Sequence, residues 1–347
     1  MTTIKTSDFG QTKDGQKVTA FDLDNGNGLS MRALDYGGTI QKLFVPDRDG
    51  NPIDIVLGYD DVASYEIGTC FYGAIIGRCA NRIGENRFML DGREIVLPPN
   101  SGETNHLHGC FHHRVFEAHE DNGALVLKYF SPDGEDGYPG NVNVEVRYLL
   151  TEDNSLELLY EATTDAPTPV NLTNHTYFNL KGQDGSTIFD HKVWLNSSAF
   201  TEYSESLAQT GNIIPVEGTP LDFRKEELIG ARYEDEYPQL RITTGYDHNM
   251  ILDGEEGAMK LIGTVKCDVT GITIEASTTE PAVQFYVSNF VGFDVVKSGK
   301  GGVVYPKNGG VCLEAQHYPD AVNHPNFPSV ILRPGEVYKQ RTVYKFS

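Results

Sequence analysis

Alternation of apolar and polar residues is the dominant pattern along the chain. Over residues 142–150 every second position is apolar, and the pattern returns over 156–162 after Asp153-Asn154-Ser155. Because side chains of a β-strand point alternately to its two faces, this pattern predicts a long hairpin. Two shorter hairpins are predicted at 88–90 with 95–97, joined by Asp91-Gly92, and at 330–332 with 337–343, joined by Arg333-Pro334-Gly335-Glu336.

Helical periodicity is nearly absent from the sequence. Only residues 222–228 and 61–65 suggest short helical turns, while 36 Gly and 17 Pro punctuate short segments throughout. Many short strands with regular turns are typical of a β-sandwich or a β-barrel. Neither a low-complexity linker nor an internal repeat is evident. We therefore predict an all-β protein in which residues 1–347 form one large domain.

The charge balance of the chain argues against strongly anionic partners. The chain has 28 Lys and Arg against 49 Asp and Glu, a net charge of −21. Such a surface repels nucleic acids and anionic lipids, and it disfavours a phosphorylated substrate unless a local basic pocket overrides it. A neutral polar ligand fits better, although solubility alone would also account for the charge. No run of 18 apolar residues suggests a membrane span.

The cysteines show no pairing pattern. There are five, an odd number without a CxxC pair, so neither a disulfide framework nor a zinc ribbon is indicated. The N-terminal residues contain no apolar stretch that could serve as a signal peptide. A cytoplasmic location is the expectation.

Two polar segments carry candidate acid–base groups. If residues 171–180 are extended, His175 lies on a face of hydrogen-bonding side chains, with a mostly apolar face opposite. Glu314 projects in the same way from a strand whose other face holds Val311, Leu313 and Ala315. The alternative for each segment is a solvated outer face. A histidine and a carboxylate in one cleft could move protons in both directions near neutral pH.

Residues 105–113 are dense in potential metal ligands. They include His106, His108, Cys110, His112 and His113. The spacing matches no zinc motif, so the competing interpretation is hydrogen bonding by His106 or His108 to a polar ligand.

Three further segments offer hydrogen-bonding groups. They are the Asn81-Arg82 pair between glycines, Asp247 and Gln284. Each alone could be a surface salt bridge, a turn residue or a satisfied strand amide. Together with the His and Glu segments and several Tyr and Phe, they suit a neutral polyhydroxylated ligand, because amides and carboxylates bind hydroxyls and aromatic rings pack on a sugar face.

Seven stretches, spread over nearly the whole chain, carry a family resemblance. They are Gly77-Arg78-Cys79-Ala80-Asn81-Arg82-Ile83, Asn105-His106-Leu107-His108-Gly109, Asp133-Gly134-Glu135-Asp136-Gly137-Tyr138-Pro139-Gly140, Asn171 to Leu180, Asp247-His248, Gln284-Phe285-Tyr286 and Leu313-Glu314-Ala315-Gln316-His317-Tyr318-Pro319-Asp320. In order and content they closely resemble the aldose 1-epimerases, also called galactose mutarotases.

The resemblance implies a large antiparallel β-sandwich with an open sugar cleft. It implies that His175 is the general acid and Glu314 the general base of anomer interconversion in free hexoses such as galactose and glucose. It assigns substrate binding to Asn81, Arg82, His108, Asp247 and Gln284. Neither a metal nor another cofactor is implied, and a monomer or homodimer is expected. A raised pKa of His175, helped by the Glu314 charge, would keep the imidazole protonated at neutral pH.

Three residues depart from the usual family pattern, and two other functions stay open. Cys110 and Ser288 stand where Gly is common, and Gly245 stands where Pro is common. All three bear on the shape of the cleft. The first alternative function is a hexose-6-phosphate 1-epimerase, which would need a basic pocket. The second is a sugar-binding or sensor protein without catalysis, for which a proton donor and acceptor pair is not required.

Overall fold

The computed structural model describes residues 2–347 and shows a fold built from antiparallel strands. The all-β prediction is confirmed. All pairings between named strands are antiparallel, which suits the short turns read from the sequence.

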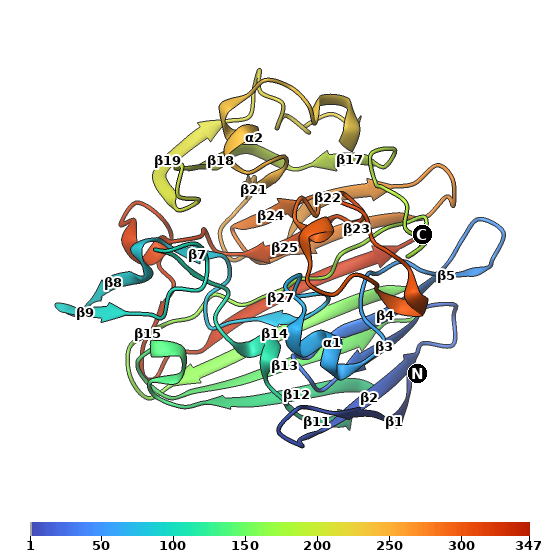
Figure 1. The fold of residues 1–347 in the computed structure, drawn as a ribbon, viewed down its shortest axis with the longest axis horizontal. Helices are drawn as coiled ribbons and strands as arrows, with labels where there is room; N and C mark the ends of the chain where they lie inside the picture. The colour runs from blue at the N-terminus through green and yellow to red at the C-terminus, as the bar shows by residue number, and fades with distance from the viewer. Residues whose placement is uncertain (1) are drawn as a thin grey trace.

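The largest sheet has nine strands and runs through the middle of the molecule (Figure 1). In spatial order they are β11 (Glu117–Asp121), β12 (Ala124–Ser131), β13 (Val142–Leu150), β14 (Ser155–Thr164), β27 (Tyr338–Phe346), β23 (Thr273–Thr278), β22 (Lys260–Lys266), β17 (Lys192–Leu195) and β20 (Glu227–Leu228).

Two five-stranded sheets accompany it. The N-terminal sheet contains β1 (Thr3–Gln11), β2 (Lys17–Asp24), β3 (Ser30–Leu34), β4 (Ile40–Pro46) and β5 (Pro52–Asp54). The other, called here the cleft sheet, has the order β19 (Gln209–Pro215), β18 (Ser197–Tyr203), β21 (Asp247–Leu252), β24 (Ala282–Tyr286) and β25 (Cys312–Gln316).

Short pairs and helices complete the fold. The two-stranded pairs are β7 (Arg82–Ile83) with β10 (His106–Leu107), β15 (Thr168–Pro169) with β26 (Ile331–Leu332), β16 (Thr173–Asn174) with β6 (Ile75–Ile76), and β8 (Arg87–Leu90) with β9 (Arg93–Val96). The helices are α1 (Val62–Ile67) and α2 (Pro238–Ile242), with single 3₁₀ turns elsewhere. Within residues 2–347, no helix has the length and apolar character needed to cross a bilayer.

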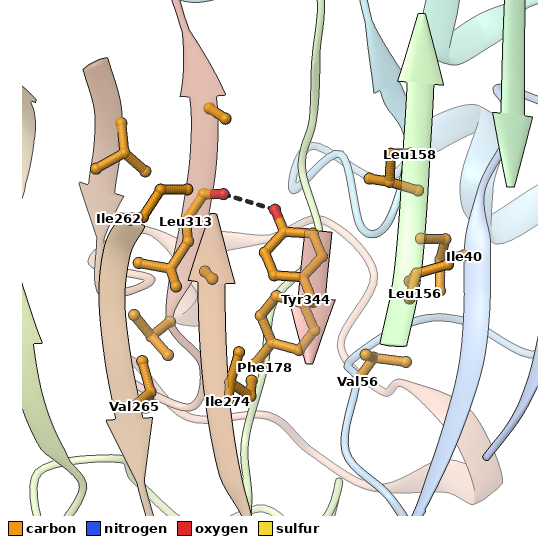
Figure 2. Packing of buried hydrophobic residues seen from close by; sticks show 14 of the residues in the cluster. Ile40, Val56, Leu156, Leu158, Phe178, Ile262, Val265, Ile274, Leu313 and Tyr344 are labelled. Atoms are coloured by element: carbon orange, nitrogen blue, oxygen red, sulfur yellow. Dashed lines mark hydrogen bonds between the residues drawn. The ribbon is translucent and has the colours of Figure 1, made fainter. Parts of the chain in front are cut away.

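One buried apolar cluster draws on all three large sheets. It includes Leu43 of β4, Leu158 of β14 and Leu313 of β25, each at most 1% exposed. Figure 2 shows part of it, with the Tyr344 hydroxyl of β27 donating to the Leu313 carbonyl at 2.7 Å. This contact ties the cleft sheet to the nine-stranded sheet, so the opposite face of the cleft sheet is the one left to form a site.

Two hairpins and one helical turn are confirmed. Strands β13 and β14 pair with Leu150 opposite Leu156, and β8 and β9 pair with Leu90 opposite Arg93. Asp91 and Gly92 have φ of 48° and 80°, the left-handed values that a two-residue hairpin turn requires. Helix α1 begins after Asp61, whose side chain accepts a hydrogen bond from the Ser64 N–H.

The third hairpin prediction is wrong. The turn after β26 exists, since the Glu336 N–H donates to the Arg333 carbonyl at 3.0 Å. Strand β26 nevertheless pairs with β15, while β27 lies between β14 and β23. Both edges of β27 are therefore occupied, and the chain changes sheet after the turn.

The helical turn predicted over 222–228 is also wrong. The Asp222 side chain accepts hydrogen bonds from Arg224, which favours a local turn over a helix. Glu227 and Leu228 then pair with β17 as β20, and a 3₁₀ turn begins only at Ile229.

Candidate active site

The cleft sheet carries polar side chains in register on its free face. Gln284 of β24 lies directly opposite Glu314 of β25, and Asp247 of β21 lies opposite Tyr286 of β24. Their strand neighbours Leu313 and Phe285 point to the apolar cluster. Alternation along β24 and β25 therefore places Gln284 and Glu314 away from the core, and the sequence predicts this orientation for Glu314.

His175 reaches the same place from another part of the chain. It follows β16, and its N–H donates to the Ala74 carbonyl at 2.9 Å while its carbonyl accepts from the Gly73 N–H at 3.0 Å. Its Nε2 lies 3.7 Å from Oε2 of Glu314, and the two side chains are only 5% and 2% exposed. The structure thus brings the two groups together, and neither lies on a solvated outer face.

A loop pair supplies further hydrogen-bonding groups. The Asn81 N–H donates to Nδ1 of His108 at 3.1 Å, and both residues have left-handed φ, 62° and 64°. Non-glycine residues take this conformation rarely, and it often marks functional sites. Sequence alternation gave no sign of it, because the segments lie outside long strands.

These groups line a cavity of about 320 Å³, near the lower end of the range for small-molecule sites. Six of the seven residues proposed from the sequence line it: Asn81, Arg82, His108, His175, Asp247 and Glu314. Gln284 stands behind it, with Nε2 donating to Oδ1 of Asp247 at 2.6 Å. Larger hollows lie elsewhere on the surface, but this one contains the paired acid–base groups.

Aromatic rings shape the cavity and hold His175. The imidazole stacks between Phe71, at a centroid distance of 5.7 Å, and Tyr177, at 4.9 Å. Tyr177 shares the polar face of residues 171–180 and was visible in the sequence, whereas Phe71 belongs to none of the quoted motifs. Phe290 and Phe293 also line the cavity and are 38% and 74% exposed.

Burial controls the proton affinities of the pair. It lowers the pKa of His175 to about 3. It raises the pKa of Glu314 well above its usual value, and the Asp247 carboxylate raises that pKa further, while Arg82 opposes the shift. The expected rise in the His175 pKa is therefore wrong, because the cost of burying the imidazolium outweighs the backbone hydrogen bond that would raise its pKa.

The histidines of residues 105–113 do not gather into one site. Nδ1 of His106 lies 2.8 Å from the Pro98 carbonyl oxygen, and Nδ1 of His113 lies 3.1 Å from the Tyr36 hydroxyl. Within residues 2–347, the one group with metal-binding geometry is His108, His175 and Glu314, whose donor atoms all lie within 4.8 Å of one another.

The tautomer of His108 does not suit that group to a metal. Its Nδ1 accepts the Asn81 N–H, so Nε2 carries the hydrogen in the neutral ring. The atom facing the cavity is then a donor, suited to an oxygen of a polar ligand rather than to a cation. Coordination through Nε2 would first require loss of this hydrogen or of the Asn81 contact.

A sequence model described as aldose 1-epimerase matches residues 19–345. The chain belongs to the aldose 1-epimerase family. It is 41% identical to galactose mutarotase of Mus musculus over 352 residues, covering 100% of this chain and 99% of that protein. It is 35% identical to aldose 1-epimerase of Escherichia coli K12, with 96% of each covered.

Solved structures agree with this family assignment. An aldose epimerase homologue from C. elegans superposes with a TM-score of 0.85 at 30% identity, covering 93% of this chain and 97% of the other. Galactose 1-epimerase from Lactobacillus acidophilus gives 0.85 at 26% identity, covering 100% and 99%. The predicted family, its sandwich fold and its class of enzyme, an isomerase, are thereby confirmed.

The three departures from the family pattern lie outside the residues that line the cavity. Ser288 is fully buried at φ 50°, and its hydroxyl accepts the Gly310 N–H at 2.9 Å. That positive φ explains why Gly is common there. Gly245 has φ 133°, which proline cannot adopt, so this chain uses a different local backbone before Asp247.

Proposed function

We propose that this protein is an aldose 1-epimerase that interconverts the α and β anomers of free hexoses such as galactose and glucose. The observation that carries the proposal is the 3.7 Å approach of His175 Nε2 to Glu314 Oε2 in a cavity lined by hydroxyl-binding groups. Relatives named galactose mutarotase and aldose 1-epimerase over their full length support it.

The proposed chemistry opens and recloses the sugar ring. Glu314 as carboxylate takes the proton of the C1 hydroxyl, and His175 as imidazolium gives a proton to the ring oxygen O5, so the C1–O5 bond breaks. The aldehyde rotates about C1–C2. Ring closure on the other face then returns one proton from Glu314 to the C1 oxygen and one from O5 to His175.

The pKa shifts assist ring opening. Burial lowers the pKa of His175 to about 3, which makes its imidazolium a stronger acid, and burial raises the pKa of Glu314, which makes its carboxylate a stronger base. The pair carries one proton before and after ring opening, and only its position changes. Burial favours the neutral pair, so the ion pair that starts ring opening forms by transfer of the shared proton from Glu314 to His175, and ring opening returns the pair to its neutral form.

Five residues are proposed to bind the sugar hydroxyls: Asn81, Arg82, His108, Asp247 and, through Asp247, Gln284. His108 offers its Nε2 hydrogen, while Asp247 accepts hydroxyl hydrogens. Aromatic residues such as Tyr286 and Phe290 line the cavity beside them and offer apolar faces to the sugar C–H groups.

The pocket composition favours a neutral sugar over a hexose 6-phosphate. Among the cavity-lining residues of the described chain, Arg82 is the single Lys or Arg, and Asp247 and Glu314 offset it. A phosphate would be repelled by these carboxylates. Equal or faster rates on glucose 6-phosphate than on glucose would favour the alternative epimerase.

The decisive experiment follows anomer equilibration of freshly dissolved α-galactose and α-glucose by NMR or polarimetry. The proposal expects rates far above the spontaneous rate and proportional to enzyme. Sugar binding without faster equilibration would instead support the sensor function.

Three broader properties are proposed with this function. Residues 1–347 form one domain, supported by the apolar cluster shared among the three large sheets. The protein is a monomer or homodimer located in the cytoplasm. A single cooperative unfolding transition, light scattering and cell fractionation would test these points in turn.

A further inference from the structure

The hydroxyl of Tyr203 joins two groups of proposed sugar-binding residues. Tyr203 ends β18 and is 2% exposed. Its oxygen accepts a hydrogen bond from Nε2 of Gln284 at 3.0 Å and another from Nδ2 of Asn81 at 3.4 Å. No motif in the sequence contains Tyr203, and it does not line the cavity itself.

Each hydrogen-bond partner of Tyr203 also donates a hydrogen bond to a residue that lines the cavity. Gln284 uses Nε2 again to donate to Oδ1 of Asp247 at 2.6 Å. Asn81 donates its N–H to Nδ1 of His108 at 3.1 Å. Tyr203 is therefore the link between the pair on the cleft sheet and the pair on the loops before β7 and after β10.

This arrangement also selects the orientation of both amides. The two lone pairs of the Tyr203 oxygen are taken by two N–H donors, so each amide turns its nitrogen toward the ring hydroxyl. Reversing the Gln284 amide would place its oxygen against the Asp247 carboxylate. Oδ1 of Asn81 accepts the Arg82 N–H at 2.8 Å. This hydrogen bond also keeps the nitrogen of the Asn81 amide turned toward Tyr203.

We propose that Tyr203 is a positioning residue for sugar recognition, which orients Asn81 and Gln284 and, through Gln284, the Asp247 carboxylate. This inference rests on the proposed function for the identity of the ligand. Because the Tyr203 hydroxyl bonds the binding groups and neither His175 nor Glu314, its loss acts on substrate binding more than on the proton transfers.

The test compares Tyr203→Phe with the unaltered protein in galactose mutarotation. Loss of about one net hydrogen bond predicts a roughly 5- to 10-fold rise in KM with kcat within about twofold. In double variants with Gln284→Ala or Asn81→Ala, the KM increases are expected to be less than multiplicative. Tyr305→Phe is the matched control, because that buried hydroxyl bonds Gln183 and Gly58, away from the binding network.

A second measurement avoids turnover. Galactose is titrated calorimetrically into Glu314→Gln protein with and without Tyr203→Phe, and the same 5- to 10-fold loss of affinity is expected, to the order of magnitude of one hydrogen bond. Unchanged KM and affinity, fully multiplicative double variants, or an equal effect of Tyr305→Phe would overturn the role of Tyr203. Absence of mutarotation by the unaltered protein would instead reject the proposed function.

Discussion

At the scale of single residues, two His–carboxylate pairs with buried carboxylates invite comparison. His175 with Glu314 lines the cavity, whereas His317 with Glu280 is a tighter pair, 2.6 Å apart, outside it. Glu280 and Glu314 are equally buried, at 2%. The chemistry therefore depends on what the pair faces, and the second pair provides an internal control for the first.

Replacing either acid–base group is expected to lower kcat strongly. Glu314→Gln and His175→Asn should each cost roughly 100- to 10,000-fold, the usual contribution of positioned general acid–base catalysis. Polarimetry at saturating galactose measures kcat of each variant. Glu280→Gln should leave the rate per folded molecule unchanged, and near-normal rates in either site variant would refute the assigned roles.

Activity is expected to be independent of added or removed divalent metal. The reason is the His108 tautomer, which presents Nε2–H to the cavity while Nδ1 is held by Asn81. Mutarotation rates before and after incubation with EDTA, and after add-back of Zn²⁺ or Mg²⁺, provide the measurement. Loss in EDTA with recovery on add-back would show that a metal takes part.

At the scale of elements, the turn before β21 determines the position of Asp247, the first residue of that strand. Gly245 has φ 133°, and its N–H donates to the Leu240 carbonyl at 2.8 Å. A Cβ at this position would lie 2.5 Å from Tyr233 and 2.6 Å from Asn289. The glycine is therefore required by this chain's own packing.

Gly245→Pro is expected to destabilise the protein by roughly 3 kcal/mol or more, because the ring fixes φ near −65° and removes the N–H donor. Urea unfolding gives the change in free energy, and KM for galactose reports displacement of Asp247. Gly257→Ala is the control: its φ is 71° but nothing lies within 4 Å, so only conformational strain of about 1 kcal/mol is expected. Equal effects would show that neither the fixed φ of proline nor the lost N–H donor at this position costs more than ordinary conformational strain.

Elements were predicted best where they are local. Residues 142–164 and 87–96 fold as hairpins because alternation and turn chemistry lie within one short stretch. The turn at 333–336 was also recognised, but its strands join different sheets. Turn residues predict that the chain reverses direction. They do not predict which sheet edge is free to pair with the next strand.

At the scale of the whole molecule, buried neutral histidines make stability depend on pH. Four histidines are at most 6% exposed and have pKa values lowered chiefly by burial: His108, His175, His191 and His248. The unfolded chain binds protons at these sites near pH 6.5, whereas the native protein does not. Their contribution to stability is thus present above pH 6.5 and is lost as the pH falls toward their lowered pKa values.

The expected size of this effect is large. At pH 5 His191 and His248, whose pKa values burial lowers to about 4 and about 3, each favour unfolding by about 2 kcal/mol, or about 4 kcal/mol for the two, a large part of the total stability of a typical domain. Urea unfolding at several pH values between 7 and 5 measures the slope of the unfolding free energy against pH. His191→Gln should reduce that slope by about one proton, because Nε2 of His191 accepts the Leu180 N–H and cannot do so when protonated. A flat profile would contradict the prediction.

The sequence by itself determined the all-β class, the local hairpins and the faces from which His175 and Glu314 project, and it predicted a neutral polar ligand. These follow from a period of two residues and from side-chain chemistry, both of which are local. Tertiary structure alone decided that the two groups lie 3.7 Å apart, that burial lowers rather than raises the pKa of His175, and that Tyr203 joins Asn81 to Gln284. The distance between two side chains, their desolvation and their hydrogen-bond partners depend on which distant segments pack together. The alternation of residues along one strand does not specify which segments will lie beside it.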